Sequence, residues 1–525
     1  MHRVRRLSPI DRFLRLFADV RSGEGATALL LAINLFLILA AYSFIKPVRD
    51  SLIITGGGAE LKSYLSAGLV LLLLFVVPAY GALANRMPRR RLINVVTFFF
   101  AACLVVFFFI GQLPVSLLVQ GVAFFLWTGI FNVMVVAQLW AFANDVYSNE
   151  EGERLFPIVA VGASLGAVAG SFSTGGVIDL AGVYPPMLVA GGILVASLWV
   201  TNYVDARERR RTEADLPNVL TSGAMPAASQ EIPLAEVRKA ITGEMRIDDV
   251  RKAITGEISL AEVRRALEKG EAPPEPEARR KATLEASLEE VELGGSRENP
   301  YRTVLRCRYL LLIGLLMLFL TWVNTNGGYI LDKLVENTAA QAVSRGALMA
   351  GSEKEYIGSF LAGFYGGVNT LGLLIQLFLV SRVIKYLGMR ASLLILPLIA
   401  LGSNLLIASL PVLGYVRWAK TVENATDYSL QNTVRNVIFL PCTREQKYKA
   451  KQAIDTFFVR AGDVSSAGLV FVGTTYLALG TRHFAVVNVA IVALALVTAA
   501  LIGREYRRLV EAGRAPCVGE DRRAA

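Results

Sequence analysis

The sequence predicts an all-α membrane protein whose twelve transmembrane helices form two bundles of six. A helix needs about 20 mostly apolar residues to cross the hydrocarbon core of a bilayer. Lipid offers the backbone no hydrogen-bond partner, so apolar stretches of that length form helices. A hydrophilic segment follows the sixth stretch and separates the two sets. We expect the spans at roughly 27–53, 62–84, 92–112, 115–143, 156–180, 184–204, 308–331, 355–383, 389–410, 412–438, 452–478 and 483–504.

Composition excludes several classes of protein. Of the 525 residues, 54% are hydrophobic and only 18% are charged, which is too apolar for a soluble protein. The net charge of +11 lies mostly in loops, so we expect the lipid bilayer and not a nucleic acid as partner. Two histidines and four cysteines show neither metal-ligand spacing nor a disulfide pattern. No phosphate-binding loop of an ATP-hydrolysing pump is present. We expect no metal, no cofactor and no enzymatic activity.

Basic residues collect on one side of the predicted membrane. Arginines and lysines precede the first span, follow the last, and fill the loops after spans 2, 8 and 10. The opposite loops, such as 55–58 and 111–114, are nearly uncharged. The positive-inside rule then predicts a multi-pass protein with both termini in the cytoplasm. For a bacterial chain this membrane is the inner, plasma membrane.

Four regions follow from this layout: an N-terminal bundle at 1–204, a cytoplasmic linker at 205–300, a C-terminal bundle at 301–510 and a cytoplasmic tail at 511–525. The linker repeats a 13-residue unit at 232–244 and 245–257, with a degraded copy at 258–270. Apolar residues at helical spacing predict short amphipathic helices there. The repeats favour a tether between the two bundles that grew by duplication, or a docking site for a cytoplasmic partner.

The two bundles carry a faint internal repeat. Gly152–Gly170 aligns without gaps to Ala450–Gly468, and each segment leads from a charged loop into an odd-numbered span. Parallel repeats of six helices predict a site between the halves, near the midplane.

Charged and amide side chains inside the predicted spans are the candidate site. A charge at bilayer depth costs at least about 2.5 kcal/mol, so it should face the bundle interior and have a partner or a function. Span 10 places its polar residues within an arc of about 120°. The predicted substrate-binding residues are Lys46, Arg49, Asp50, Asn324, Arg417, Lys420, Glu423, Asp427, Arg460 and Asp463.

Two interpretations of these charges remain open. They could pair with one another and join helices, or some cations could face an anionic substrate, since arginine and lysine both bind phosphate. Spans 1 and 10 carry more cations than they can pair internally, so an anion site is favoured. Lys46 and Lys420 are the best candidates for phosphate contacts. Stacking on a base is a weaker expectation for Tyr42, Phe44, Trp322 and Tyr329.

A second set of charges lies at the cytoplasmic ends of the spans. Salt bridges there could hold the protein closed towards the cytoplasm, or the side chains could simply be solvated. The predicted gate residues are Asn144, Asp145, Arg154, Lys447, Lys451 and Asp455.

Two segments resemble motifs of the major facilitators. Gly81–Arg91 resembles their signature between spans 2 and 3, with Asn85 and Pro88 where that family usually has Asp and Gly. In span 5, glycines recur every fourth residue from 162 to 170, as in the antiporter motif of that family. Such spacing also lets any two helix backbones approach closely.

Other segments resemble the bacterial and plastid-type ATP/ADP translocases. The resemblance rests on Lys46–Asp50, on Trp140–Asn144 continuing to Ala163, and on Tyr428 through Pro441 to Asp455. It implies a twelve-helix fold similar to the major facilitators and an exchange of ATP for ADP, or nucleotide import. The family's acidic residues correspond here to uncharged positions near Thr128 and Asn324, and its lysine in span 11 is replaced near Asp463.

The sequence therefore favours a nucleotide exchanger or importer that works by alternating access without hydrolysis. The first alternative is a proton-coupled carrier of another organic anion or a drug, with Glu423, Asp427 or Asp463 as the proton site. The second is a membrane platform that does not transport, whose repeats recruit a cytoplasmic partner.

Overall fold

A computed structural model describes residues 20–21, 24–84, 86–87, 89–136, 138, 149–221, 300–442, 450–512 and 516–517. Every regular element among these residues is helical. The chain divides into two compact units, one made of Met1–Val204 with Pro300–Ala525 and the other of Asp205–Asn299. The repeats at 232–270 lie outside the described residues. The predicted domain boundaries, and the predicted partner for these repeats, therefore stay predictions.

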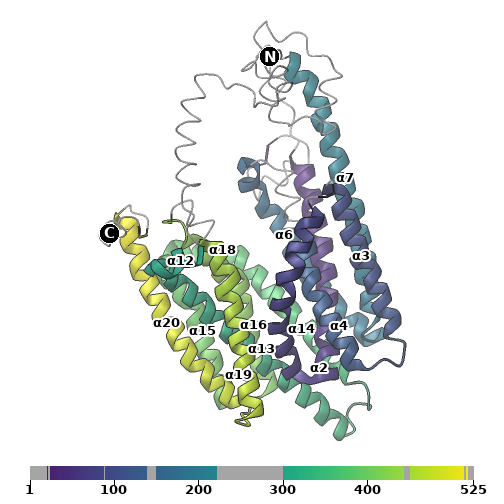
Figure 1. The fold of residues 1–525 in the computed structure, drawn as a ribbon, viewed down its shortest axis with the longest axis vertical. Helices are drawn as coiled ribbons and strands as arrows, with labels where there is room; N and C mark the ends of the chain where they lie inside the picture. Colours follow the sequence, from purple (N-terminus) through teal and green to yellow (C-terminus); the bar gives the residue numbers. More distant parts are fainter. Residues whose placement is uncertain are drawn as a thin grey trace. The chain divides into compact units, whose positions relative to one another are not determined.

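The N-terminal half of the first unit is built from long helices (Figure 1). They are α2 (Gly25–Ala84), α3 (Arg89–Ile110), α4 (Leu117–Phe131) followed by the π-helical η1 (Asn132–Val136), α6 (Asn149–Ala181) and α7 (Pro185–Thr221). α2 makes extensive contacts with both α6 and α4.

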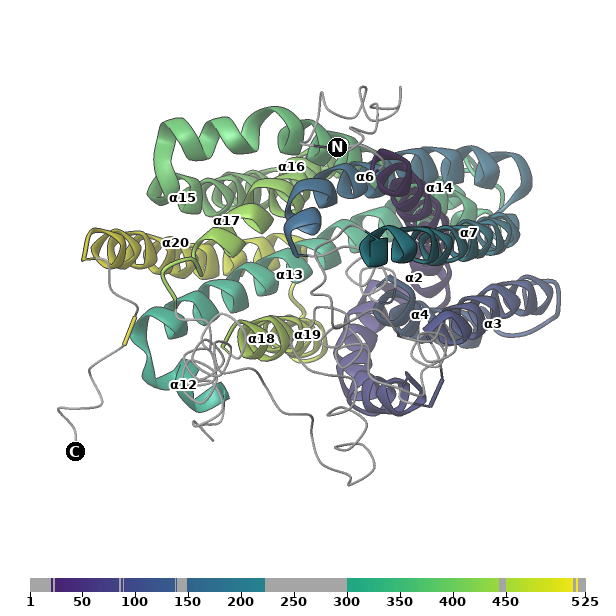
Figure 2. The same cartoon turned by 90° about the horizontal axis from the view of Figure 1, so that it is seen from above.

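The C-terminal half begins with α12 (Pro300–Arg306) and α13 (Arg308–Ser344). The elements that follow are α14 (Glu353–Leu374), η3 (Ile375–Leu379), α15 (Val380–Ser409), α16 (Leu413–Thr426), η4 (Asp427–Gln431), α17 (Asn432–Val437), α18 (Lys451–Ala453), η6 (Ile454–Phe458), α19 (Val459–Thr475) and α20 (Thr481–Ala512). Figure 2 shows α13, α15, α16 and α20 gathered on one side, with α14 next to α6.

Eight stretches within the described residues are long and apolar enough to cross a membrane. Two of them, Gly25–Leu73 and Glu353–Ser409, are far longer than the roughly 20 residues that one crossing takes. Gly58, with φ 82°, and Gly388, with φ 74°, interrupt the helical geometry of α2 and α15. Positive φ is accessible to glycine without steric cost, which explains the position of both bends. The chain is thus a multi-pass membrane protein, and the count of twelve spans stays a prediction.

The glycine series of span 5 lies directly on span 1. A Cβ atom added at any of these three glycines of α6 would come within 2.2–2.5 Å of a carbonyl oxygen of α2. The pairs are Gly162 with Ala32, Gly166 with Phe36, and Gly170 with Ala40. Only glycine lets the two backbones approach this closely, so the three glycines serve the packing of α6 against α2.

Each half has its own hydrophobic core, and a smaller cluster joins the two. The cores centre on residues such as Phe124 in the N-terminal half and Leu316 in the C-terminal half. In the joining cluster, Ile54 of α2 and Phe125 of α4 group with Leu361 of α14. Because Ile54 lies four residues before the bend at Gly58, this cluster joins the two halves near that bend.

One expectation about cysteine is wrong. The sequence showed no disulfide pattern, yet Cys307, between α12 and α13, forms a disulfide with Cys517 of the tail. The two cysteines are 210 residues apart, so only the course of the chain after α20 brings them together. Cys103 and Cys442 do not take part in a disulfide.

Candidate functional site

A cavity of about 220 Å³ lies between the two halves. α2, η1 and α6 supply one wall, and α14 and η4 supply the other. Its lining residues are Leu39, Tyr42, Ser43, Lys46, Asn132, Ala167, Ser171, Tyr365, Asn369 and Tyr428. We call it the central cavity. The internal repeat predicted a site between the halves, and this cavity is the candidate for it.

The α2 wall follows from helical periodicity. Leu39, Tyr42, Ser43 and Lys46 are spaced by three and four residues, so they share one face of the helix. Within the described residues, Lys46 has no carboxylate partner. Its ammonium instead lies 3.8 Å from the centroid of the Tyr365 ring, a cation–π contact. Lys46 is the one charged side chain among the lining residues described here.

The opposite wall combines aromatic rings with amides. Tyr365 and Asn369 are four residues apart on α14, so they project from one face. The Asn369 amide donates to the Ala167 carbonyl at 3.2 Å and to the Ser171 hydroxyl at 3.1 Å, which joins α14 to α6. Tyr428 comes from the π-helical η4. π-helical turns are frequent at functional sites because the extra residue re-aims the side chains around it.

A charge network lies one turn of α2 beyond Lys46, on the side of the cavity nearer the bend at Gly58. Asp50, one turn beyond Lys46, is fully buried and pairs with Arg49 at 2.6 Å and with Lys62 at 3.3 Å. Lys62 also pairs with Asp332 of α13 at 2.8 Å, and the Tyr365 hydroxyl donates to Asp50 at 2.6 Å. α2 of one half is thereby tied to α13 and α14 of the other.

A second network lies beside the first. Lys333 of α13 pairs with Glu60 at 2.9 Å and with Glu336 at 3.3 Å. The Tyr329 hydroxyl donates to Glu60 at 3.0 Å, and the Ala59 amide donates to Glu336 at 3.1 Å. Ala59 and Glu60 directly follow the bend at Gly58, so the bend itself is held against α13. We call the two networks together the closure.

Arg49 and Asp50 therefore belong to the closure and not to the cavity lining. Sequence reasoning missed Lys62, which pairs with both Asp50 and Asp332, and it missed Lys333 of the second network. The signal was available, since Lys62, Asp332 and Lys333 are charges within long apolar stretches, but their pairing across the halves is not visible in the sequence.

Lys420 does not meet the expectation of an unpaired cation available for phosphate. It is only 1% exposed, and its ammonium pairs with Glu423 at 2.7 Å and donates to Asn324 at 3.1 Å. The physical reason is local: Glu423 lies three residues along the same helix, on the same buried face. Asn324, Glu423 and Asp427 line a separate, water-sized cavity inside the C-terminal half.

The remaining predicted binding residues lie elsewhere. Arg417 lies over the Phe360 ring, 5.0 Å from its centroid, and borders a different cavity of about 640 Å³ that also involves Asp179 and Glu355. Arg460 pairs with Asp463 at 3.2 Å, and Asp463 accepts a hydrogen bond from Thr325. None of these residues lines the central cavity.

The predicted cytoplasmic gate is described only in part. Asp455 pairs with Arg435 of its own half, and Lys451 donates to Asn436 at 2.7 Å. The gate residues Asn144, Asp145 and Lys447, together with the side chain of Arg154, lie outside the described part of the chain.

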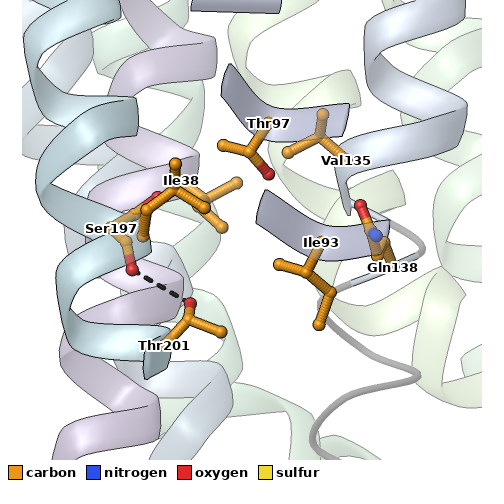
Figure 3. A pocket seen from close by; sticks show the side chains of 8 residues that line it. Ile38, Ile93, Thr97, Val135, Gln138, Ser197 and Thr201 are labelled. Atoms are coloured by element: carbon orange, nitrogen blue, oxygen red, sulfur yellow. Dashed lines mark hydrogen bonds between the residues drawn. The ribbon is translucent and has the colours of Figure 1, made fainter. Parts of the chain in front are cut away.

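A small polar cavity inside the N-terminal half is too small for an organic ligand. Figure 3 shows Thr97, Gln138 and Thr201 around it, and the Thr201 hydroxyl donates to the Ser197 carbonyl. Its volume of about 10 Å³ holds about one water molecule. Within the residues described, no group of three or more histidine, cysteine or acidic side chains could hold a metal ion.

Comparisons with known proteins agree with this architecture. Residues 26–423 match the family model described as Major Facilitator Superfamily. None of the curated proteins compared with the chain matches it.

Among solved structures, a peptide transporter POT in complex with sulfate is similar to the chain, with TM-score 0.53, 13% identity and coverage of 96% of this chain and 99% of that one. A bacterial homologue of the iron transporter ferroportin, in an inward-facing state, is similar with TM-score 0.53, 11% identity and coverage of 91% and 98%. A D-xylose–proton symporter is similar with TM-score 0.52, 10% identity and coverage of 90% and 96%. At such identities the likeness shows the fold alone. The family match covers most of the sequence, and the chain therefore belongs to the Major Facilitator Superfamily of membrane transporters.

Proposed function

We propose that this transporter carries a small organic anion with an aromatic ring by alternating access, without hydrolysis. Exchange of nucleotides such as ATP and ADP is the specific form that we test first, because of the resemblance of the sequence to the nucleotide translocases. The observation that carries the proposal is Lys46, a lysine without a carboxylate partner among the described residues, facing a cavity between the two halves.

The cavity supplies the two kinds of contact that such a substrate needs. The Lys46 ammonium is a point charge for a phosphate or carboxylate oxygen. Tyr42, Tyr365 and Tyr428 offer ring faces, and the amides of Asn132 and Asn369 offer hydrogen bonds. A bound anion would draw the Lys46 ammonium away from the face of the Tyr365 ring.

The number of positive charges in the central cavity limits the negative charge of the substrate. One lysine matches about one negative charge, whereas ATP carries about four. Arg49 lies three residues beyond Lys46 on α2, and its pairing with Asp50 is part of the closure. When the closure opens, Arg49 becomes the nearest additional cation for a polyphosphate. A substrate of lower charge, such as a nucleoside monophosphate, needs only Lys46.

Transport requires the closure to break and the opposite end to close, as the two six-helix halves rock about the site. In the predicted orientation, with both termini in the cytoplasm of a bacterial cell, the bend at Gly58 faces the outside. The conformation described here is then closed to the outside by the network around Asp50 and Glu60.

Counter-flow in liposomes tests the proposal. Vesicles preloaded with ATP should take up labelled ADP, with AMP and adenosine tested as competitors of lower charge. Lys46→Gln should lower the exchange rate about tenfold or more, because a hydrogen bond to a charged group is worth about 1.5–3 kcal/mol. Lys46→Arg keeps the charge and should retain part of the rate.

Lys385→Gln is the matched control, since Lys385 is a lysine of α15 whose ammonium lies over the neighbouring Tyr386 ring, away from the cavity. Absence of exchange with every adenine compound would overturn the nucleotide assignment. Loss of transport in Lys385→Gln equal to that in Lys46→Gln would overturn the role of the central cavity.

A second candidate is a proton-coupled carrier of another organic anion or a drug. It is favoured by the single cation of the cavity, which suits a monoanion, and by the carboxylates inside the C-terminal half. Uptake driven by a pH gradient and lost in Asp463→Asn would favour this candidate over exchange.

A further inference from the structure

A disulfide joins the tail of the chain to the start of the C-terminal half. Cys307 lies between α12 and α13, and its partner Cys517 lies 210 residues later, after the end of α20. Figure 2 shows the short tail segment of Pro516 and Cys517, in yellow, near the start of α13. Neither cysteine lines the central cavity, so the transport proposal gives this covalent bond no role.

Both cysteines lie at the end of the C-terminal half where basic residues gather. Cys307 comes directly before α13 and Cys517 comes soon after α20, while the Arg390 side chain packs against Gly503 near the end of α20. By the positive-inside rule this end faces the cytoplasm, as the sequence predicts for the C-terminus. The basic residues of this end are Arg306, Arg308, Arg390, Arg504, Arg507 and Arg508.

The predicted cytoplasmic position makes the bond unusual. Glutathione and thioredoxin keep thiols reduced in the cytoplasm, so the disulfides that form there are usually transient and serve catalysis or redox sensing. The chain belongs to a superfamily of transporters. Redox sensing therefore fits this disulfide better than permanent stabilisation does.

The two sulfur atoms differ in their access to a reductant. Cys307 is 2% exposed and belongs to the apolar core of the C-terminal half, whereas Cys517 is half-buried and packs against that core from outside. A disulfide opens when a thiolate attacks one of its sulfur atoms directly. The sulfur of Cys517 is therefore the one that an attacking thiolate reaches.

The backbone of Cys517 favours release once the bond is open. Its φ of 62° is in the left-handed region, which residues other than glycine rarely adopt. Such a conformation persists only where the surrounding structure holds it. The disulfide and the buried Pro516 beside it hold Cys517 in place, so opening the disulfide removes one of the two restraints.

We propose that the disulfide of Cys307 and Cys517 is a reversible redox site on the cytoplasmic face, which fastens the tail segment when oxidised and releases it when reduced. The inference goes beyond the proposed function, because the state of the disulfide does not depend on which anion is carried. Both cysteines belong to the C-terminal half, so the bond does not cross-link the two halves.

A dithiol of the thioredoxin class is the reductant that the site takes. One thiolate of the dithiol attacks the sulfur of Cys517 and forms a mixed disulfide, and Cys307 leaves as a thiolate that takes up a proton. The second thiol of the dithiol then attacks the mixed disulfide and releases Cys517 as a thiol. The protein gains two electrons and two protons, and the dithiol loses both and becomes a disulfide.

Trapping of the thiol state in cells tests the proposal. Bacterial cells that produce the full-length chain are quenched with acid before and after exposure to the thiol oxidant diamide. The protein is then alkylated in denaturing detergent and mapped by mass spectrometry without reduction. We expect alkylated Cys307 and Cys517 in untreated cells, the disulfide between them after diamide, and alkylated cysteines again once diamide is removed.

Three outcomes of this mapping would overturn the proposal. The first is a disulfide present in all the samples, which is a permanent cross-link. The second is alkylation of both cysteines in all the samples, which means that the bond does not form in the cell. The third is pairing of Cys307 with a cysteine other than Cys517 after diamide.

Thermal unfolding of the purified chain in detergent tests whether the bond fastens the tail segment. A disulfide that closes a long loop restricts the unfolded chain, so the oxidised protein should melt several degrees higher than the same protein in dithiothreitol. Cys517→Ser should melt like the reduced wild type under both conditions. Cys442→Ala is the matched control: it removes a buried cysteine of the same core that takes no part in the disulfide, and it should keep the shift.

Equal melting temperatures of the oxidised and the reduced wild type would contradict fastening of the tail segment. Should Cys517→Ser fail to fold, the comparison of the oxidised and reduced wild type, with the disulfide mapped in each sample, decides the matter. No organic anion is present in either experiment, so the results are independent of the counter-flow experiment.

Discussion

Lys46 and Lys420 look equivalent in the sequence, and the structure gives them opposite environments. Each is a lysine within a long apolar helix, one in each half. Lys46 of α2 faces the central cavity, and its ammonium lies over the ring of Tyr365. Lys420 of α16 is buried against Glu423 and takes no part in that cavity.

The two lysines differ in whether the nearest carboxylate on the same helix already has other partners. Glu423 is free to pair with Lys420 one turn away on the same face. The carboxylate one turn from Lys46 is Asp50, and it is already held by Arg49, Lys62 and Tyr365. A cation in a membrane helix is available to a substrate only if its helical neighbours are committed elsewhere.

The largest expected effect comes from breaking the pair of Lys420 and Glu423. Lys420→Met leaves Glu423 buried without its partner, and loss of one member of a buried pair costs about 3–5 kcal/mol. The melting temperature of the purified protein should fall sharply. Lys46→Met is the matched change in the other half and should lower transport with little loss of stability. Equal destabilisation by the two substitutions would remove the contrast between these lysines.

A smaller loss of stability is expected when alanine replaces a tightly packed glycine of the N-terminal half, and no loss is expected at an open glycine of the C-terminal half. Gly166→Ala places a Cβ 2.2 Å from the Phe36 carbonyl oxygen, so α6 and α2 must move apart. Overpacking of this kind costs about 1–3 kcal/mol. Gly468 of α19 has no atom within 4 Å of the equivalent position, and Gly468→Ala should leave the stability unchanged. Thermal unfolding of both variants measures the difference; a fully tolerated Gly166→Ala would contradict the close packing.

The smallest effect is expected at the outer part of the closure. Lys333→Gln breaks pairs with Glu60 and Glu336 whose side chains are about a quarter exposed. Exposed pairs contribute about 0.2–1 kcal/mol, so the stability should change little. The equilibrium between the closed and the open conformation should shift towards the conformation in which the closure is broken. A cysteine placed at Ser63 should then be labelled faster. Lys354→Gln, a change at a lysine outside the closure, should leave that labelling rate unchanged.

The sequence predicted the membrane class, the helical fold and Lys46 as a candidate phosphate contact, because hydropathy and the presence of a charge in an apolar stretch are local properties. It also identified Glu423 and Asp427 as charges that need a partner. It did not identify the aromatic wall from Tyr365 and Tyr428, since aromatic residues are frequent throughout membrane helices. Nor did it find the pairing of Lys62 with Asp332, which joins positions far apart in the chain.

The amino-acid sequence alone determined that the chain crosses a bilayer in two sets of helices and that several charges lie within them. That much follows from the cost of exposing backbone and charge to lipid. Only the tertiary structure decided which charges neutralise one another, because ion pairing falls off within a few ångströms and depends on how separate helices are placed. The same placement left Lys46 facing the cavity and Lys420 enclosed.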